Sequence, residues 1–550
     1  MLAKKVNNTI QVSFNYNHAL VQFVKSFSGR KYDPAKKVWT LPLVNGLKTI
    51  ERLSGRGFAI ETDLLAVADQ EEKRVKEVLE VSKLDDTEFE TSLPLFPYQR
   101  VGSAFLCKVG SGLLGDEMGL GKTIQALAVC ENTKAEKILI FCPSAVKWQW
   151  ADEIKKFLNE YRVTVVVVDG KKTLRRTQWA MASVNIAPTY VIANYELLLH
   201  DFDLINMVGE WDVLIADEAT RISNPMAKQS KAIKKLQAKR RIALTGTPIS
   251  NRANEIWNIV DFLNTGALGS YWDFVQHYCL KNQFGGIYGY QNMGELGEIL
   301  KRYMIRRHKA DVLPELPDKI STDIPFELSA EEKALYKKIK KEILFEIEAK
   351  DIKKLESPMT IQYTLVKMLR LRQLADSMEL LGENVQSSKL EVLKELLTEA
   401  LKDNTKKAIV FTQFAEMADI LERELKEWKP FKISGKIKEE YHTVVERFNE
   451  DESNRVLIMT AAGMFGLNIQ KASIIFHYDQ EWSLGKMQQR AGRAHRIGQK
   501  DTVLEYNLLA KGTVDYYVKK VLHDKAKLSD ELLGDKPIDM DEIRDILNYE

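Results

Sequence analysis

The chain of 550 residues is too long for one core and long enough for roughly three or four domains, each burying its own apolar interior. Its composition, 45% hydrophobic and 29% charged, includes no apolar run near the ~20 residues of a membrane span, which excludes a membrane-embedded protein. The four cysteines lie far apart, which excludes a disulfide framework or a zinc site of paired cysteines. We therefore expect a multidomain cytoplasmic protein, associated with the nucleoid in a bacterial or viral source, or a nuclear one in a eukaryote.

The first sixty residues are strongly basic, with ten Lys and Arg against two acids, although the net charge of the chain is only +3. Residues 61–94 reverse the balance, with eleven acids against four bases. Such asymmetry is typical of a basic module that binds a polyanion and is joined to the rest of the chain by an acidic helical connector. A charged surface that only faces solvent explains the charges equally well. Aromatic residues between the bases suit stacking on unpaired nucleotides, or else the core of a small α+β domain. The candidate DNA-binding residues here are Arg30, Lys37 and Trp39.

From residue 110 onward, short apolar runs alternate with helix-like segments, a pattern typical of βαβ units and a mainly parallel sheet. The predicted strands are 112–115, 137–143, 163–169, 190–195, 212–217 and 241–246 in a first series, and 407–413, 455–460, 473–479 and 503–509 in a second. Two series predict two α/β lobes, with ligands beyond the carboxyl ends of the strands. Between them, residues 251–385 have the period of amphipathic helices rather than of a third sheet, and the last 35 residues predict further helices.

The segment DEMGLGKT (116–123) follows a predicted strand and begins a predicted helix. It matches the phosphate-loop pattern G-x-x-x-x-G-K-[ST], except that Asp116 replaces the first glycine. In this context backbone amides can bind phosphates from a helix N-terminus, Lys122 can reach the β and γ phosphates, and Thr123 can ligate Mg²⁺. Upstream, Gln99 could contact the adenine edge, unless this segment is an ordinary helix start. The candidate nucleotide-binding residues are Gln99, Asp116, Gly119, Gly121, Lys122 and Thr123.

An acidic strand end and a pair of arginines complete the predicted hydrolytic site. Asp217 can orient Mg²⁺ and Glu218 can polarise the attacking water, although an acidic turn after a buried strand is the plain alternative. Arg493 and Arg496 are three residues apart, so on a helix both project from one face and could act as arginine fingers; a solvated arginine pair is the common alternative. The candidate catalytic residues are Lys122, Asp217, Glu218, Gln489, Arg493 and Arg496, and the candidate metal ligands are Thr123 and Asp217.

In their order along the chain, these motifs resemble the SWI/SNF-type ATPases of helicase superfamily two over about residues 93–515. The matching segments are DEMGLGKTIQ, CPSAVKWQWADE, ANYELL, IADEAT, LTGTPISN, YMIRRHKADVLPELP, VFTQF, Thr460 to Asn468, and QRAGRAHRIGQ. The family commonly begins its phosphate loop with an acid, as at Asp116. The resemblance implies ATP and Mg²⁺, two RecA-like lobes with parallel sheets, helical insertions between them, and an ATP contact at Gly466. Thr220, in place of the histidine of D-E-A-H, and Met464, in place of glycine, depart from the family pattern and put the coupling of hydrolysis to movement in doubt.

The resemblance also implies double-stranded DNA as the partner, tracked along its backbone without strand separation. Polar and aromatic residues at predicted strand ends could contact its phosphates, although each one alone is more often structural. The candidates are Lys147, Trp148, Asn194, Tyr195, Thr247, Asn251, Gln413, Thr460, Asn468 and Trp482. The basic run of Arg306, Arg307 and Lys309 matches the family's brace between the lobes, where we expect a mainly structural role.

At the N-terminus, the segment from Arg30 to Trp39 resembles the HARP module of annealing helicases through R-K-Y-D-x-x-x-K-x-W. The leading hypothesis is therefore a DNA-dependent ATPase, a translocase on double-stranded DNA that remodels branched DNA by annealing strands or regressing forks. The alternatives are a motor that displaces or recycles DNA-bound complexes such as RNA polymerase, a switchable clamp, and a strand-separating helicase. We expect a monomer, with single-stranded-DNA-binding protein or RNA polymerase as candidate further partners.

These interpretations divide the chain into six parts. The expected domains are a HARP-like basic DNA-binding module (1–60), an acidic helical connector (61–92), a first RecA-like ATPase lobe (93–250), a helical insertion with the inter-lobe brace (251–385), a second RecA-like lobe (386–515) and C-terminal helices (516–550). The fold class is α/β with a small α+β module at the N-terminus.

Overall fold

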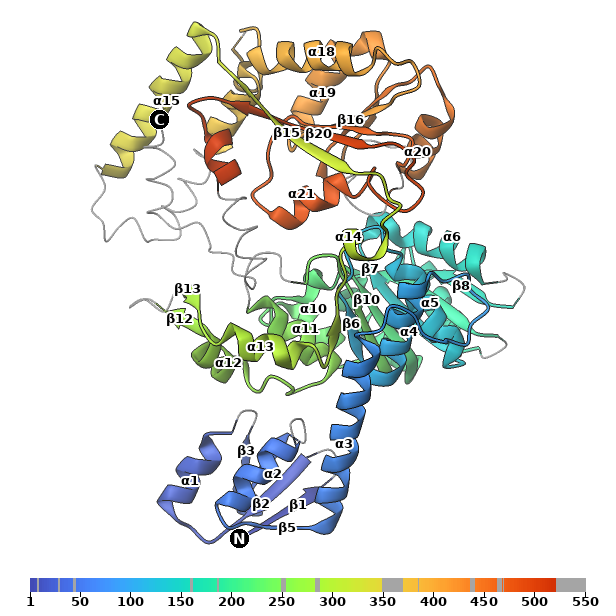
Figure 1. Cartoon of the computed structure of the whole chain (residues 1–550), viewed down its shortest axis with the longest axis vertical. Helices are drawn as coiled ribbons and strands as arrows, with labels where there is room; N and C mark the ends of the chain where they lie inside the picture. The colour runs from blue at the N-terminus through green and yellow to red at the C-terminus, as the bar shows by residue number, and fades with distance from the viewer. Residues whose placement is uncertain are drawn as a thin grey trace. The chain divides into compact units, whose positions relative to one another are not determined.

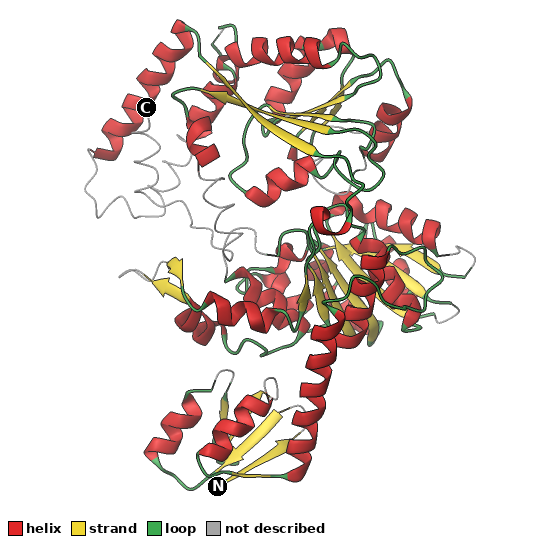
Figure 2. Cartoon of the chain, viewed as in Figure 1, coloured by secondary structure: helices red, strands yellow, loops and turns green. Residues whose placement is uncertain are grey.

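The structure of the chain is a computed structural model that describes residues 1–6, 9–27, 30–42, 46–158, 162–184, 187–248, 254–281, 287–348, 369–383, 385–435, 441–461, 467 and 469–520. These residues form two compact units, one over Met1–Val312 and one that begins at Leu313 (Figure 1). Each unit contains a parallel sheet with helices packed against it (Figure 2). In the described part of the chain, we find no helix both long and apolar enough to cross a membrane.

The N-terminal module is a small α+β fold whose five-stranded sheet has the order β3-β4-β2-β1-β5. The strands are β1 (Leu2–Val6), β2 (Thr9–Ser13), β3 (Lys31–Asp33), β4 (Val38–Pro42) and β5 (Ala59–Ile60), and the helices are α1 (His18–Lys25), α2 (Gly46–Gly55) and, leading out of the module, α3 (Thr62–Val81). Phe14, Phe23 and Trp39 pack against the buried core, whereas Tyr16 is 85% and Tyr32 49% exposed. Most of these aromatic residues therefore belong to the core of the module.

Seven parallel strands in the order β14-β6-β11-β10-β7-β9-β8 form the main sheet of the first unit. They are β6 (Gly112–Leu114), β7 (Lys137–Cys142), β8 (Thr164–Val167), β9 (Thr189–Asn194), β10 (Trp211–Asp217), β11 (Ala238–Leu244) and β14 (Met304–Ile305). The helices around them are α4 (Pro97–Val109), α5 (Lys122–Asn132), α6 (Lys147–Phe157), α7 (Lys172–Met181), α8 (Leu197–His200), α9 (Phe202–Met207), α10 (Lys228–Ile233) and α11 (Glu255–Leu263). The six predicted strands of the first series are confirmed. Their continuous apolar runs follow from burial on both faces of the sheet.

The segment predicted as purely helical also contains strands, so this prediction is wrong in part. After α12 (Tyr271–Tyr278), β12 (Cys279–Lys281) and β13 (Ile287–Tyr290) pair as an antiparallel hairpin, followed by α13 (Met293–Leu300). Strand β14 then pairs with β6, and α14 (Lys309–Val312) ends the unit. These strands are two to four residues long, too short to show a period in the sequence.

Six parallel strands in the order β15-β20-β19-β16-β18-β17 form the sheet of the second unit. They are β15 (Lys319–Phe326), β16 (Ala408–Phe411), β17 (Phe431–Ile433), β18 (Val456–Met459), β19 (Ile474–His477) and β20 (Val503–Ala510), and the helices are α15 (Ala330–Glu348), α18 (Ser388–Ala400), α19 (Ala415–Glu424), α20 (Tyr441–Glu450) and α21 (Leu484–Ala491). Four strands match the second predicted series, whereas the apolar pattern does not predict β15 and β17. Strand β15 lies at the sheet edge with its first five residues exposed, so it lacks the apolar run of a buried parallel strand.

Candidate nucleotide and DNA site

The carboxyl ends of three neighbouring strands bring the predicted hydrolytic residues to one edge of the first sheet. In the register, Leu114 of β6 is paired with Leu244 of β11, and Leu244 with Asp217 of β10. The segments that follow these strands therefore lie side by side. They are the loop 115–121 after β6, the turn 245–247 after β11 and the acidic end of β10. Ligands of open parallel α/β sheets bind at this edge.

Two glycines shape the loop between β6 and α5. Gly119 has a φ of 88° and Gly121 a φ of 74°, in the left-handed region that residues with a side chain avoid. Gly121 is the N-cap of α5, and a Cβ there would collide with the amide of Gln99. The first backbone amides of α5, at Lys122 and Thr123, have no acceptor within the helix, and both residues are partly exposed. This is the geometry of an anion site at a helix N-terminus.

The ammonium of Lys122 lies over the loop. Its Nζ donates to the backbone oxygen of Asp116 at 2.8 Å and to that of Glu117 at 3.4 Å. On another side, a Cβ added to Gly246 would lie 3.6 Å from the same Nζ, so the turn 245–247 passes close to the ammonium. The ammonium thus lies between the loop and the turn 245–247.

The carboxylate of Asp116 is fully buried behind the loop. It accepts from Arg307 Nε at 2.9 Å, from a second nitrogen of the same guanidinium, and from Gln125 Nε2 at 3.1 Å. Arg307 also donates to the backbone oxygen of Tyr98, and its guanidinium lies 5.3 Å from the centre of that ring. Asp116 thus fixes the shape of the loop from inside the protein, and the contacts of Arg307 are structural ones within the first unit.

Gln99 lies directly against the loop and is buried. Its Oε1 accepts from the N–H of Phe96 at 3.0 Å, and its Nε2 donates to the backbone oxygen of Leu120 at 3.1 Å. Tyr98 also donates its hydroxyl to the Leu120 oxygen, at 3.2 Å. Both ends of the Gln99 amide therefore have partners within the protein, and the adenine contact stays a prediction.

The acidic end of β10 is held in a fixed orientation. Asp217 Oδ2 accepts from Trp150 Nε1 at 2.8 Å, and Oδ1 accepts from the N–H of Glu218 at 2.9 Å. The hydroxyl of Tyr195 donates to the backbone oxygen of Asp217 at 2.7 Å. Glu218 has a φ of 50°, an uncommon conformation of the kind that gathers at functional sites. Among the described residues, no group of three or more His, Cys, Asp and Glu side chains is gathered to hold a metal.

The predicted DNA contacts of the first unit differ in exposure. Trp148 is 49% exposed at the start of α6, and Asn194 is partly exposed at the end of β9. Lys147 is buried, where its Nζ lies 3.1 Å from the carboxylate of Asp169. The side chains that face the protein interior rather than a ligand are those of Lys147, Tyr195 and Thr247, and Asn251 lies outside the described residues.

The three candidate residues of the N-terminal module lie in different settings. Arg30 is partly buried and pairs with Asp273 of α12 at 3.4 Å. Lys37 is exposed in the turn before β4, with a φ of 53°. Trp39 is partly exposed, and its ring centre lies 4.9 Å from that of Tyr32. Lys37 and Trp39 are therefore accessible to solvent, and Arg30 already has a carboxylate partner in Asp273.

In the second unit, β16 pairs with both β18 and β19, so the three strands end at one edge of the sheet. The carboxylate of Asp479 there accepts from the N–H of Gln413 at 2.6 Å and from Thr412 Oγ1 at 2.8 Å. Thr460 is buried and donates its N–H to the backbone oxygen of Ile433 at 3.0 Å. Within the described residues, Gln413 Oε1 is buried without a hydrogen-bond partner.

The helix expected to carry the arginine pair ends too early, so the prediction that Arg493 and Arg496 share a helix face is wrong. Helix α21 ends at Ala491, because a glycine with low helix propensity follows it. Arg493 is buried, and its guanidinium donates to the backbone oxygens of Gln489 at 3.1 Å and Leu467 at 3.2 Å. Arg496 is partly exposed in the turns that follow. Outside the described residues lie Met464, Gly466 and Asn468.

Arg490 is a buried residue of this motif that the sequence analysis missed. Its guanidinium donates to Asp479 Oδ1 at 3.2 Å and to Glu481 Oε1 at 3.0 Å. Although burial opposes the charged form, the charges of Arg490 and Arg372 lower the pKa of Asp479. Trp482 is partly buried, with the guanidinium of Arg372 5.8 Å from its ring centre. The available signal for Arg490 was its place in QRAGRAHRIGQ, eleven residues after Asp479.

Two family models match the chain. The SNF2-related domain matches residues 23–380, and the helicase conserved C-terminal domain matches residues 388–498. The first of these matches begins inside the N-terminal module and continues past the start of the second unit.

Relatives with these domains occur among curated proteins and solved structures. YwqA of Bacillus subtilis, provisionally named an ATP-dependent helicase/translocase, is 31% identical over 462 residues, which are 80% of this chain and 49% of YwqA. An uncharacterized ATP-dependent helicase of Mycoplasma pneumoniae is 32% identical over 431 residues, which are 77% of this chain and 40% of that protein. The chain thus spans less than half of the length of these relatives. The solved SWI2/SNF2 ATPase core of Sulfolobus solfataricus in complex with dsDNA is 30% identical, with 85% of this chain and 100% of that chain covered and a TM-score of 0.39.

Proposed function

The chain belongs to the SNF2-related family of helicase-like ATPases, and we propose that it is an ATP-driven translocase on double-stranded DNA that remodels branched DNA by annealing strands or regressing forks. The observation that carries the proposal is the meeting of the phosphate loop, the turn 245–247 and the acidic end of β10 at one sheet edge. Hydrolysis of a phosphate anhydride needs a phosphate cradle, a metal ligand and a group that orients water, and in this proposal the loop, Asp217 and Glu218 at this edge take these three roles.

The residues at this edge fit ATP with Mg²⁺. The amides at the start of α5 and the ammonium of Lys122 would hold the phosphates, since the left-handed glycines expose the helix N-terminus. Thr123 and Asp217 would serve as metal ligands, and a magnesium ion in such sites neutralises charge on the phosphates. Glu218 would orient the attacking water. Gln99 and Asp116 support the loop from the protein side.

The arginine fingers of this proposal are Arg493 and Arg496, with Gln489 beside them. Arg493 is buried and donates to two backbone oxygens, so it must give up hydrogen bonds before it can serve a phosphate. Arg496 is the more exposed of the two. Removal of such a finger costs roughly 10³ to 10⁵ in turnover where this has been measured.

The branched-DNA part of the proposal depends on the N-terminal module. Its surplus of eight positive charges suits a polyanion, and the exposed Lys37 and Tyr32 lie at its surface beside Trp39. We assign junction recognition to this HARP-like module (1–60), hydrolysis to the first lobe (93–250) and the arginines to the second lobe (386–515). In this division, residues 61–92 are the connector and residues 251–385 hold the helical insertion with the brace, although β15 within them belongs to the sheet of the second unit.

The test is ATP hydrolysis by the full chain with duplex, forked, single-stranded DNA and RNA at equal nucleotide concentration. We expect the fork to stimulate most, the duplex less and RNA not at all, because the proposed grip is on a DNA backbone next to an unpaired strand. Lys122→Ala is the control and should abolish hydrolysis with every substrate. Equal stimulation by single-stranded RNA contradicts the proposal.

The same measurement separates the remaining candidate function. A motor that displaces DNA-bound complexes such as RNA polymerase needs the same tracking but has no reason to prefer a fork. Equal stimulation by duplex and fork, together with copurification of RNA polymerase, would favour that motor over the remodelling of branched DNA.

A further inference from the structure

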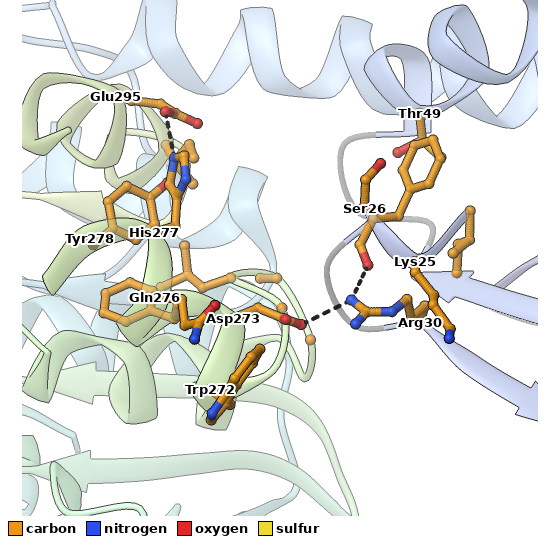
Figure 3. Close-up of a pocket in the computed structure, with 18 of the residues that line it drawn as sticks. Lys25, Ser26, Arg30, Thr49, Trp272, Asp273, Gln276, His277, Tyr278 and Glu295 are labelled. Carbon is orange, nitrogen blue, oxygen red and sulfur yellow. Dashed lines mark hydrogen bonds and ion pairs between the residues drawn. The ribbon is translucent and has the colours of Figure 1, made fainter. Parts of the chain in front are cut away.

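A cleft of about 660 Å³ lies between the N-terminal module and the segment that contains α12 and α13 (Figure 3). Lys25, Arg30 and Arg52 line its module wall, and Trp272 and Asp273 of α12 line the opposite wall. This volume lies within the range of sites that hold small ligands, so it would accept about one or two nucleotides rather than a duplex.

The module wall of the cleft is cationic. The guanidinium of Arg52 lies 4.2 Å from the ring centre of Phe27 and donates to Ser26 Oγ at 2.8 Å, so its charge is not neutralised by an acid in these contacts. The ammonium of Lys25 is exposed, and no carboxylate within the described residues pairs with it. Of these three cations, Arg30 alone has an acidic partner among the described residues, Asp273 across the cleft. Clustered cations of this kind favour phosphate groups.

The opposite wall offers a stacking surface. Trp272 is 60% exposed on the first turn of α12, which is unusual for the largest apolar side chain. Beside it, Asp273 is partly exposed and accepts a hydrogen bond from Ser270 Oγ at 2.7 Å in addition to its pair with Arg30. In Figure 3 the Arg30 side chain reaches from the module to Asp273 across the cleft. The pair at 3.4 Å is long, and Asp273 keeps Ser270 as a partner when Arg30 leaves.

We propose that this cleft binds an unpaired DNA nucleotide, with the phosphate on Lys25 and Arg30 and the base stacked on Trp272. Binding exchanges the pair of Arg30 with Asp273 for a pair with phosphate. The inference rests on the proposed function and deepens it, because an unpaired nucleotide beside a duplex is what distinguishes a fork. It places part of the junction recognition on α12, outside the basic module.

The exchange predicts effects of opposite sign for two neighbouring residues. With the full chain and a short labelled oligothymidylate in fluorescence anisotropy, Trp272→Ala should weaken binding about tenfold, because a stacking platform is lost. Asp273→Asn should tighten binding about threefold, because Arg30 no longer has a competing carboxylate. Unchanged binding by Trp272→Ala overturns the proposal, and so does weaker binding by Asp273→Asn.

Matched variants guard against indirect effects. Met207→Ala removes another exposed apolar side chain, 77% exposed on α9, and should leave oligothymidylate binding unchanged. Lys25→Ala should weaken binding several-fold, whereas Lys5→Ala, an exposed lysine of β1 in the same module that does not line the cleft, should not. If labelled polyglutamate binds the wild type more tightly than oligothymidylate does, the cleft serves an acidic polypeptide and the proposal is overturned.

Duplex-stimulated ATP hydrolysis, measured on the same proteins, separates this inference from the proposed function. Trp272→Ala should hydrolyse ATP with duplex at the wild-type rate and lose only the extra stimulation by a fork. A wild type that binds oligothymidylate through Trp272 but hydrolyses no ATP with duplex supports the cleft and contradicts the translocase. A wild type stimulated by duplex, with Trp272→Ala equal to it in oligothymidylate binding, contradicts the cleft alone.

Discussion

Asp116 stands where the phosphate-loop pattern has glycine, and its buried carboxylate is paired with Arg307. The Arg307 side chain is only 12% exposed, so restoring glycine would leave its charge without a carboxylate. Breaking a buried pair by removing one partner costs roughly 3–5 kcal/mol. We expect Asp116→Gly to lower the free energy of unfolding of the first unit by about that amount, measured by denaturant titration. Adding Arg307→Met should recover part of the loss, because the unpaired charge is then gone.

A surface pair elsewhere in the same unit provides the control. Asp86 lies 2.5 Å from Arg100, with side chains that are 50% and 31% exposed. Solvent screens such a pair, so Asp86→Gly should change the midpoint of unfolding far less than Asp116→Gly. Equal effects of the two substitutions would contradict the role of Asp116 as the internal support of the loop.

Strands β19 and β20 carry a buried pair that makes the second unit sensitive to acid. His477 Nε2 lies 2.8 Å from Glu505 Oε1. Burial, helped by the charges of Arg490 and Lys319, lowers the pKa of His477, although Glu505 opposes this. In the unfolded state the ring has its ordinary pKa of about 6.5. As pH falls through that value, the unfolded state therefore binds more protons than the folded state, and the free energy of unfolding decreases.

The expected result is a lower Tm of the second unit at pH 5.5 than at pH 7.5 in calorimetry, over a range where ordinary carboxylates stay ionised. His477→Gln should reduce this dependence on pH, because no ring remains to be protonated on unfolding. The exposed His18→Gln should leave the dependence as it is in the wild type. Equal dependence of Tm on pH in the wild type and in His477→Gln would refute the assignment, because Asp376 of the same unit, whose pKa burial raises to about 8, contributes to both.

At the level of elements, sequence predicted what lies inside the sheets better than what lies at their edges. Strands β7 and β10 are apolar over consecutive residues, so the sequence predicts that they are buried. Parallel pairing of the strands then brings Lys122 and Asp217 to one edge of the sheet. Strand β15 is mostly exposed and β14 is two residues long, so neither has the run of apolar residues that predicts a buried parallel strand. The partner of Asp116 at Arg307 is 191 residues downstream, and such a pair depends on packing that no local pattern contains.

For the whole molecule, the uneven charge predicts a salt dependence that belongs to the N-terminal module. Each phosphate contact contributes about 0.9 to the slope of log affinity against log salt for duplex DNA. Replacing the exposed Lys36 and Lys37 by alanine should therefore make the slope for forked DNA shallower, by up to about 2 in magnitude. The measurement is fluorescence anisotropy at several salt concentrations. The same change at the exposed neighbours Lys155 and Lys156 of α6 should leave the slope intact. Equal losses from both pairs would mean that the module has no special part in binding.

The contacts behind the phosphate loop also hold the end of the first unit. The N–H of Lys309 donates to Glu117 Oε2 at 2.9 Å, two residues beyond Arg307, and the second unit begins at Leu313. The last residues of the first unit, Lys309–Val312, are thus anchored beside the loop itself. A nucleotide that displaced Glu117 would therefore act directly on α14, the last helix of the first unit.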